Sequence, residues 1–196
     1  MKTIIWDVDD VLNDLMREWF EGKWLPENAG CVLDYTDLLR NPPEAILGIA
    51  RAEYLRSLDD FRLASFSRLK PVPEALAWFE KHGSCHRHLA LTSVPLNAAP
   101  LSAEWVSRHF GRWIRSFNFV PSPRDSDVAS PVFDRTKQDF LRWLNLSDTV
   151  VVDDSESNIT GARELGIPGV LVPRPWNQGR GTIPQALEHL DSLLQD

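Results

Sequence analysis

The sequence has few cysteines, no long hydrophobic run and no excess of basic residues. Its two cysteines, Cys31 and Cys85, do not make a disulfide framework, which predicts a protein of the reducing cytoplasm. No apolar run approaches the roughly 18 residues of a membrane-spanning helix, and the amino-terminal segment does not have the pattern of a signal peptide. The 21 basic and 28 acidic residues give a net charge of -7, the wrong sign for binding a nucleic-acid polymer.

The composition that remains is typical of a globular protein. The 196 residues, 43% hydrophobic and 25% charged, are enough for one domain with an insertion. Short apolar runs typical of β-strands lie at Thr3–Trp6, His88–Leu91, Ser116–Val120, Thr149–Val152 and Gly169–Val172. Helical spacing lies at Pro73–His82, Ser102–Phe110 and Asp134–Leu144, with Ser102 and Asp134 as N-caps, and at Ser157–Leu165 and from Thr182 onward. This alternation predicts an α/β fold, a Rossmann-like parallel sheet with helices on both faces.

Residues 14–70 have a different pattern from the rest of the chain. They show helix-like apolar spacing, interrupted by Pro26, Gly30 and the breaker Asn41-Pro42-Pro43, with no β-type run between them. We therefore expect a core made of residues 1–13 and 71–196, and a small all-helical insertion at 14–70, after the first strand. The insertion would lie at the carboxyl edge of the sheet, where ligands bind in parallel α/β proteins.

Polar side chains lie where the predicted strands end. They are Asp7 and Asp9 after the first strand, Thr92 and Ser93 after the second, Lys137 on a helix, and Asp153 and Asp154 after the fourth. Because the carboxyl ends of parallel strands meet at one edge, we expect these groups to converge there. Like charges about 4 Å apart repel by roughly 4 kcal/mol at an effective dielectric constant near 20. A cation must offset this repulsion, and hard carboxylate ligands together with a substrate phosphate favour Mg²⁺.

These segments resemble the motifs of the haloacid dehalogenase-like hydrolases. Ile4-Ile5-Trp6-Asp7-Val8-Asp9-Asp10-Val11-Leu12 is similar to motif I, and Leu89-Ala90-Leu91-Thr92 to motif II. Lys137 resembles the motif III lysine, and Arg124 and Arg135 are the alternative candidates for that role. Motif IV resembles the segment Val150-Val151-Val152-Asp153-Asp154-Ser155. The resemblance covers residues 1–12 and 71–175 in order and spacing. Asp10 stands where the family often has glycine.

The resemblance implies a phosphatase that works through an aspartyl-phosphate intermediate. Asp7 would be the nucleophile, and Asp9 would protonate the leaving alcohol and then deprotonate the attacking water. Mg²⁺ would be held by Asp7, the backbone carbonyl of Asp9 and Asp154, with Asp153 close or ligating. Thr92, Ser93 and Lys137 would bind the phosphoryl oxygens. The acid at Asp9 argues for a phosphatase, because the dehalogenase branch lacks one there.

The insertion resembles a small helical C1-type cap, which predicts where the substrate is selected. The size of the insertion is similar to that of the cap in the 5'-nucleotidase and deoxyribonucleotidase branch. Two segments of the core also resemble that branch, Leu91-Thr92-Ser93 and Pro175-Trp176-Asn177. We therefore expect a small phosphorylated substrate, and a nucleoside monophosphate is the first choice. Five aromatic residues could stack on its base: Trp19, Phe20, Trp24, Tyr35 and Phe61. The alternatives are a phosphatase for another small phosphomonoester such as a sugar phosphate, and a catalytically silent binding protein of the same fold.

Several other residues receive a structural interpretation. Trp6, Trp78, Trp105 and Trp143 are expected in the core, whereas Trp176 is the tryptophan expected to contact a ligand, with Arg174 and Arg180 near it as possible anion partners. The cluster His82, Cys85, His86 and His88 matches no ordinary zinc spacing and predicts a solvated turn between a helix and a strand. A receiver domain is disfavoured, because an acidic cluster closes the series after Lys137 and because this chain is longer than such a domain and has a helical insertion.

Overall fold

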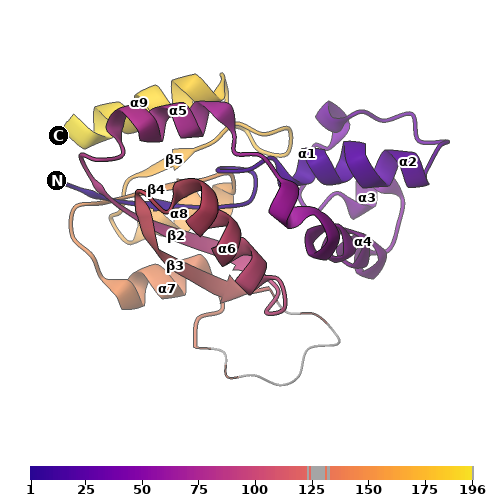
Figure 1. Ribbon diagram of the computed structural model, residues 1–196, viewed down its shortest axis with the longest axis horizontal. Helices are drawn as coiled ribbons and strands as arrows, with labels where there is room; N and C mark the ends of the chain where they lie inside the picture. Colours follow the sequence, from indigo (N-terminus) through magenta and orange to yellow (C-terminus); the bar gives the residue numbers. More distant parts are fainter. Residues whose placement is uncertain (123, 125–130, 132, 196) are drawn as a thin grey trace.

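A computed structural model describes residues 1–122, 124, 131 and 133–195 and contains a five-stranded, all-parallel sheet (Figure 1). The strands are β1 (Thr3–Trp6), β2 (Arg87–Val94), β3 (Ile114–Pro121), β4 (Thr149–Asp153) and β5 (Gly169–Leu171). Their order is β3-β2-β1-β4-β5, so β1 lies at the centre between β2 and β4. The predicted parallel α/β fold is confirmed.

Helices cover both faces of this sheet. They are α5 (Pro73–His82), α6 (Ala99–Phe110), α7 (Lys137–Leu144), α8 (Glu156–Glu164) and α9 (Ile183–Gln195). Neighbouring residues of β1 pack into different cores, because side chains alternate between the faces of a strand. Ile4 and Trp6 pack with side chains of α5, α6 and α9, whereas Ile5 packs with side chains of α7 and α8. Both faces are apolar, which explains why the strand sequences do not alternate between polar and apolar residues.

Two predicted helix starts are wrong. The helix expected from Ser102 begins at Ala99, with proline in its first turn, and Ser102 is buried inside it. The helix expected from Asp134 begins at Lys137 and is capped by Thr136, whose side chain accepts from the backbone of Asp139 in a capping box. In both places a stronger local start signal, the early proline or the reciprocal Thr136–Asp139 pair, overrides the predicted cap.

One of the four tryptophans expected in the core is not there. Trp6, Trp78 and Trp105 are buried, but Trp143 is 71% exposed. The inward side of α7 is formed by Phe140 and Leu141, and Trp143 lies outside that face.

Residues 14–70, which we call the cap segment, contain helices and no strand. These elements are α1 (Leu15–Trp19), η1 (Phe20–Trp24), α2 (Leu25–Glu27), η2 (Tyr35–Asp37), α3 (Glu44–Leu47), α4 (Arg51–Ser65) and η3 (Phe66–Arg68). The cap segment lies beyond one end of the sheet (Figure 1). Its two connections to the core lie side by side: Asn13 and Pro71 form an antiparallel bridge, and the Val72 N–H donates to the Leu12 carbonyl at 2.8 Å.

A buried histidine supports the strand that leads to the predicted site. His88 on β2 accepts a hydrogen bond from the Trp6 indole at 3.1 Å and lies 2.8 Å from the Gly83 carbonyl, to which its Nε2–H can donate. Burial lowers the pKa of His88 to about 4, so the ring is neutral at pH 7. Cys85 is exposed, as expected for a solvated turn. The prediction of a solvated position is wrong for His88, whose ring is buried because its two hydrogen bonds satisfy both ring nitrogens.

Among the residues that the structure describes, no helix is both long and apolar enough to cross a membrane.

Candidate functional site

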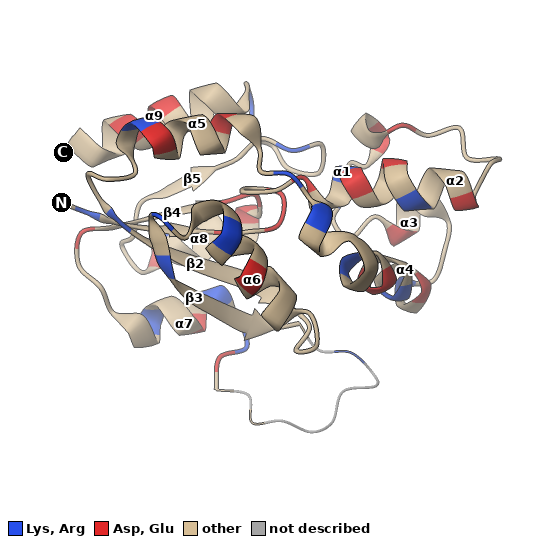
Figure 2. Ribbon diagram, viewed as in Figure 1, with Lys and Arg blue, Asp and Glu red and all other residues tan. Residues whose placement is uncertain are grey.

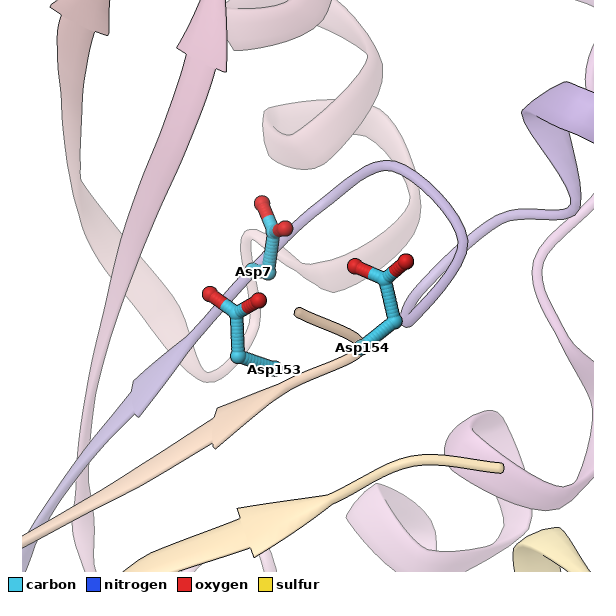
Figure 3. A group of neighbouring side chains, drawn as sticks. All are labelled: Asp7, Asp153 and Asp154. Atoms are coloured by element: carbon cyan, nitrogen blue, oxygen red, sulfur yellow. The ribbon is translucent and has the colours of Figure 1, made fainter. Parts of the chain in front are cut away.

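Three aspartates meet at the carboxyl edge of the sheet (Figure 3). One carboxylate oxygen from each of Asp7, Asp153 and Asp154 lies within 4.8 Å of the other two. The pairing of β1 with β4 causes this convergence, because Trp6 is opposite Val152 and the Asp7 N–H donates to the Val152 carbonyl at 2.9 Å. Asp7, the first residue after β1, therefore lies beside Asp153, the last residue of β4. Residues about 145 positions apart thus form one acidic group, as the strand-end argument predicts.

Lys137 provides the positive charge inside this group. Its ammonium nitrogen lies 2.8 Å from Asp7 Oδ2 and 2.7 Å from Asp153 Oδ2, and the residue is 4% exposed. The first turn of α7 brings it there. Of the rivals, Arg124 pairs with Asp59 and Arg135 is exposed. The two carboxylates raise the pKa of Lys137 against the opposing effect of burial, so the side chain is charged.

Asp153 and Asp154 differ in what surrounds them. Asp153 is surrounded by donors: besides Lys137, it accepts from the Ser155 N–H at 2.8 Å and from the Asn158 amide at 3.1 Å. Asp154 accepts one side-chain hydrogen bond, from the Trp176 indole at 2.7 Å, and lines the adjacent cavity. Asp154 therefore has the more accessible oxygen, and Asp153 fixes the position of Lys137.

Burial and mutual repulsion disfavour ionisation in this group. Burial raises the pKa of Asp7 well above its usual value, and Asp153 and Asp154 add to the rise while Lys137 opposes it. Burial raises the pKa of Asp154 to about 8, with further contributions from Asp153 and Asp10. Three carboxylates share one lysine, so a bound divalent cation would neutralise the remaining charge. The hard oxygen donors fit such an ion.

Asp9 lies on the same cavity but outside the three-aspartate group. Its Oδ2 accepts from Arg62 Nη2 at 2.9 Å, and its Oδ1 accepts from the Asn13 amide at 3.2 Å. Arg62 belongs to α4 of the cap segment, 53 residues along the chain. No local sequence signal marks Arg62 as a site residue, since it lies within an ordinary helix.

Asp10 shapes the turn that follows β1, as its local turn chemistry suggests. Its φ is 62°, in the left-handed region that glycine enters most readily, which accounts for the glycine often found here in the family it resembles. Its carboxylate accepts from the Met16 N–H at 2.9 Å, and its carbonyl accepts from Arg174 Nε at 2.6 Å. Burial raises the pKa of Asp10 to about 7, and Arg174 opposes the rise.

Arg174 is not among the residues that line the cavity. It is buried and pairs with Asp14 as well as with the Asp10 carbonyl. Arg174 and Asp10 thus fix the turn that leads into the cap segment. Asn177 has a similar bracing role: its amide donates to the Asp154 carbonyl at 2.7 Å and to the Val172 carbonyl at 2.8 Å.

Thr92 and Ser93 line the cavity from β2. Thr92 is 1% exposed, and its hydroxyl has no hydrogen-bond partner among the described residues. Leaving a buried hydroxyl unpaired costs about 1–3 kcal/mol, so such a group indicates a missing partner. Ser93 is exposed at the same end of the strand. Both residues thus lie beside Asp7 and Lys137 at this cavity, and their predicted role in binding phosphate stays a prediction.

The cavity has a volume of about 500 Å³ and is lined by both the core and the cap segment. Acidic residues lie in the loops between the sheet and the cap segment, and α4 and α7 carry both basic and acidic residues (Figure 2). The predicted stacking platform is wrong: its five aromatic residues, Trp19, Phe20, Trp24, Tyr35 and Phe61, are buried and do not line the cavity. They form the core of the cap segment, since their apolar faces are covered there. Trp176 does line the cavity, as expected.

No protein-family model matches this sequence, and no curated protein matches it. Solved structures do match its fold. A haloacid dehalogenase-like family hydrolase from Streptococcus pneumoniae is 15% identical, with 98% of each chain covered and a TM-score of 0.62. A predicted phosphatase from Clostridium acetobutylicum is 16% identical, with 99% of this chain and 96% of that chain covered and a TM-score of 0.60. CbbY from Rhodobacter sphaeroides, in complex with xylulose-(1,5)bisphosphate, is 15% identical, with 92% of this chain and 90% of that chain covered and a TM-score of 0.52.

The chain therefore has the fold of the haloacid dehalogenase-like hydrolases, as its four motifs imply. None of these three structures is described as a nucleotidase, so they do not show the resemblance to the 5'-nucleotidase branch.

Proposed function

We propose that this protein is a Mg²⁺-dependent phosphomonoester hydrolase that acts through an aspartyl-phosphate on Asp7. The observation that carries the proposal is the position of Asp7, which contacts the Lys137 ammonium and lies beside Asp154 on a cavity that Thr92 and Ser93 also line. A nucleophilic carboxylate, a cation and free donors on one cavity are what phosphoryl transfer requires, because the protein contributes mainly positioning and charge stabilisation.

The proposed reaction has two steps. In the first, an Asp7 oxygen attacks phosphorus, the bond from phosphorus to the leaving oxygen breaks, and Asp9 gives its proton to that oxygen. In the second, water attacks the same phosphorus, Asp9 takes the water proton, and the phosphorus–Asp7 bond breaks to release inorganic phosphate. Lys137, Thr92 and Ser93 hold the phosphoryl oxygens, and their donors stabilise the charge that spreads over them.

Asp7 and Asp154 would hold the Mg²⁺, together with the backbone carbonyl of Asp9 and with Asp153 beside them. When bound, the ion supplies Lewis-acid polarisation and neutralises charge on the phosphoryl group. The residues fit this ion, because their donors are oxygens and their carboxylates exceed the available positive charge.

Magnesium affinity is expected to increase with pH between about 6 and 8. The carboxyl of Asp154, with its pKa of about 8, carries a proton below that pH and must lose it before it can bind metal. We expect the Mg²⁺ dissociation constant to fall by up to about tenfold per pH unit and to level off near pH 8. Isothermal titration calorimetry across this range measures it. Asp154→Asn should bind weakly and lose the part of the dependence that comes from Asp154, whereas the raised pKa of Asp7 leaves the remainder. A dissociation constant that is flat in the native protein would contradict the assignment.

For the substrate, we propose a small phosphomonoester of the sugar-phosphate type, with the cap segment as the part that selects it. The aromatic residues expected to stack on a base are buried, and the cavity wall contains charged groups of α4, including Arg51 and Arg62. CbbY, which has the same fold, was solved with a sugar bisphosphate. A polar leaving group suits this wall better than a flat apolar base does.

A screen of phosphomonoesters tests both parts of the proposal. We expect Mg²⁺-dependent release of phosphate from p-nitrophenyl phosphate, and kcat/KM values at least about tenfold higher for sugar phosphates than for nucleoside monophosphates. The reverse preference would restore the nucleotidase assignment and leave the mechanism intact. No release from any ester, with Mg²⁺ present and the protein folded, would favour a silent binding protein.

A further inference from the structure

A chain of polar contacts runs from Asp9 through the cap segment and back to the core. Arg62 contacts Asp9 at 2.9 Å and Asp59 at 3.3 Å, and Asp59 contacts Arg124 at 2.6 and 2.9 Å. Asp59 and Arg62 are three residues apart on α4, so they lie on the same face of that helix. Arg124 in turn donates to the Ser122 carbonyl at 2.9 Å, just after β3. Helix α4 is therefore joined to the core at two places.

All three ion pairs of this chain are largely buried, and the contact of Arg62 with Asp9 is the most buried of them. Arg62 is 6% exposed, and the exposed fraction of the Asp9 side chain is 12%. Ion pairs at the solvent-exposed surface contribute little to stability. A buried charge, by contrast, strongly destabilises the fold if its partner is removed. Arg62 carries a permanent charge, and it has carboxylates on two sides, at Asp9 and Asp59. Its position is therefore tightly coupled to the position of the Asp9 carboxylate.

Both oxygens of Asp9 have a donor, and the two donors come from different parts of the fold. Asn13, in the turn after β1, donates to Oδ1, and Arg62, in the cap segment, donates to Oδ2. Asn13 is itself fixed, since its own side-chain oxygen accepts from the Asp10 and Leu15 N–H groups. The orientation of the Asp9 carboxylate is thus determined by a core residue and a cap residue together.

We propose that Arg62 is a positioning residue for the acid–base step, and that it acts through Asp9. This inference rests on the proposed function, in which Asp9 gives a proton to the leaving oxygen and later takes one from water. Arg62 and Asn13 each contact one oxygen of the Asp9 carboxyl group, and together they fix the plane in which that group faces the cavity. Because Arg62 is on α4, proton transfer depends on the cap segment being in place over Asp7.

The test compares leaving groups in Arg62→Gln. The value of kcat/KM reports the steps up to transfer of phosphorus to Asp7, in which the acid protonates the leaving oxygen. An alkoxide needs that proton, whereas p-nitrophenolate leaves without it. We expect Arg62→Gln to lower kcat/KM at least about tenfold for the best alkyl phosphate of the screen, and less than about threefold for p-nitrophenyl phosphate. The matched control is Arg56→Gln, an exposed arginine on the same helix, which should change neither value.

A double-mutant cycle with Asp9→Asn removes the effect of folding from this test. If Arg62 acts through Asp9, Arg62→Gln should cause no further loss with the alkyl phosphate in the Asp9→Asn background. Equal losses with the two esters, or a full additional loss in that background, would overturn the inference while leaving the proposed function intact. A native protein that hydrolyses neither ester would overturn both.

Discussion

Asp7→Asn is expected to reduce Mg²⁺-dependent phosphate release from p-nitrophenyl phosphate by at least about 10³-fold, because it removes the proposed nucleophile. An amide oxygen is a poor nucleophile and cannot form the acyl phosphate. Phosphate release is measured at saturating Mg²⁺, and covalent phosphate on the protein is measured after acid quenching. The native protein should become labelled and the variant should not.

Stability measurements separate the loss of a nucleophile from a loss of folding. The pKa of Asp7 is raised by burial and by its acidic neighbours, so its charge is costly in the metal-free protein at neutral pH. We expect the melting temperature of Asp7→Asn in EDTA to equal or exceed that of the native protein. Retained turnover in a folded variant would be incompatible with catalysis by Asp7.

Lys137→Met should produce the largest loss of stability. In the native protein the Lys137 ammonium nitrogen lies 2.8 Å from Asp7 Oδ2 and 2.7 Å from Asp153 Oδ2. The substitution leaves both carboxylates buried without this cation. Breaking a buried ion pair by removing one partner typically costs about 3–5 kcal/mol, and we expect a decrease in the free energy of unfolding near this range. Urea denaturation in EDTA measures it. We also expect turnover to fall by at least about 10²-fold, since a donor to the phosphoryl group is lost.

The matched control is Lys81→Met, the same change at an exposed position in α5, which should alter stability by less than about 0.5 kcal/mol. Part of the loss in Lys137→Met should be recovered by Mg²⁺, because the ion can take over the neutralisation of Asp7. A variant as stable as the control would show that the carboxylates do not depend on Lys137.

The sequence determined the sheet and the acidic site because both depend on local patterns. Runs such as Thr3–Trp6 and Thr149–Val152 are apolar on both sides, a pattern typical of a strand that is covered on two faces. Parallel pairing then places the residues that follow them at one edge, so Asp7 and Asp153 could be brought together by reasoning from strand ends alone.

Tertiary structure decided which side chains of the helices face the cavity. Five aromatic residues of the cap segment proved to be its core, and Arg62, with no distinguishing neighbours in the sequence, proved to contact Asp9. Helical spacing shows that a residue shares a face with others, but it does not show what that face meets. That depends on how α4 is rotated against the core, and contacts such as Arg62 with Asp9 and Asp59 with Arg124 form only once those distant segments have packed.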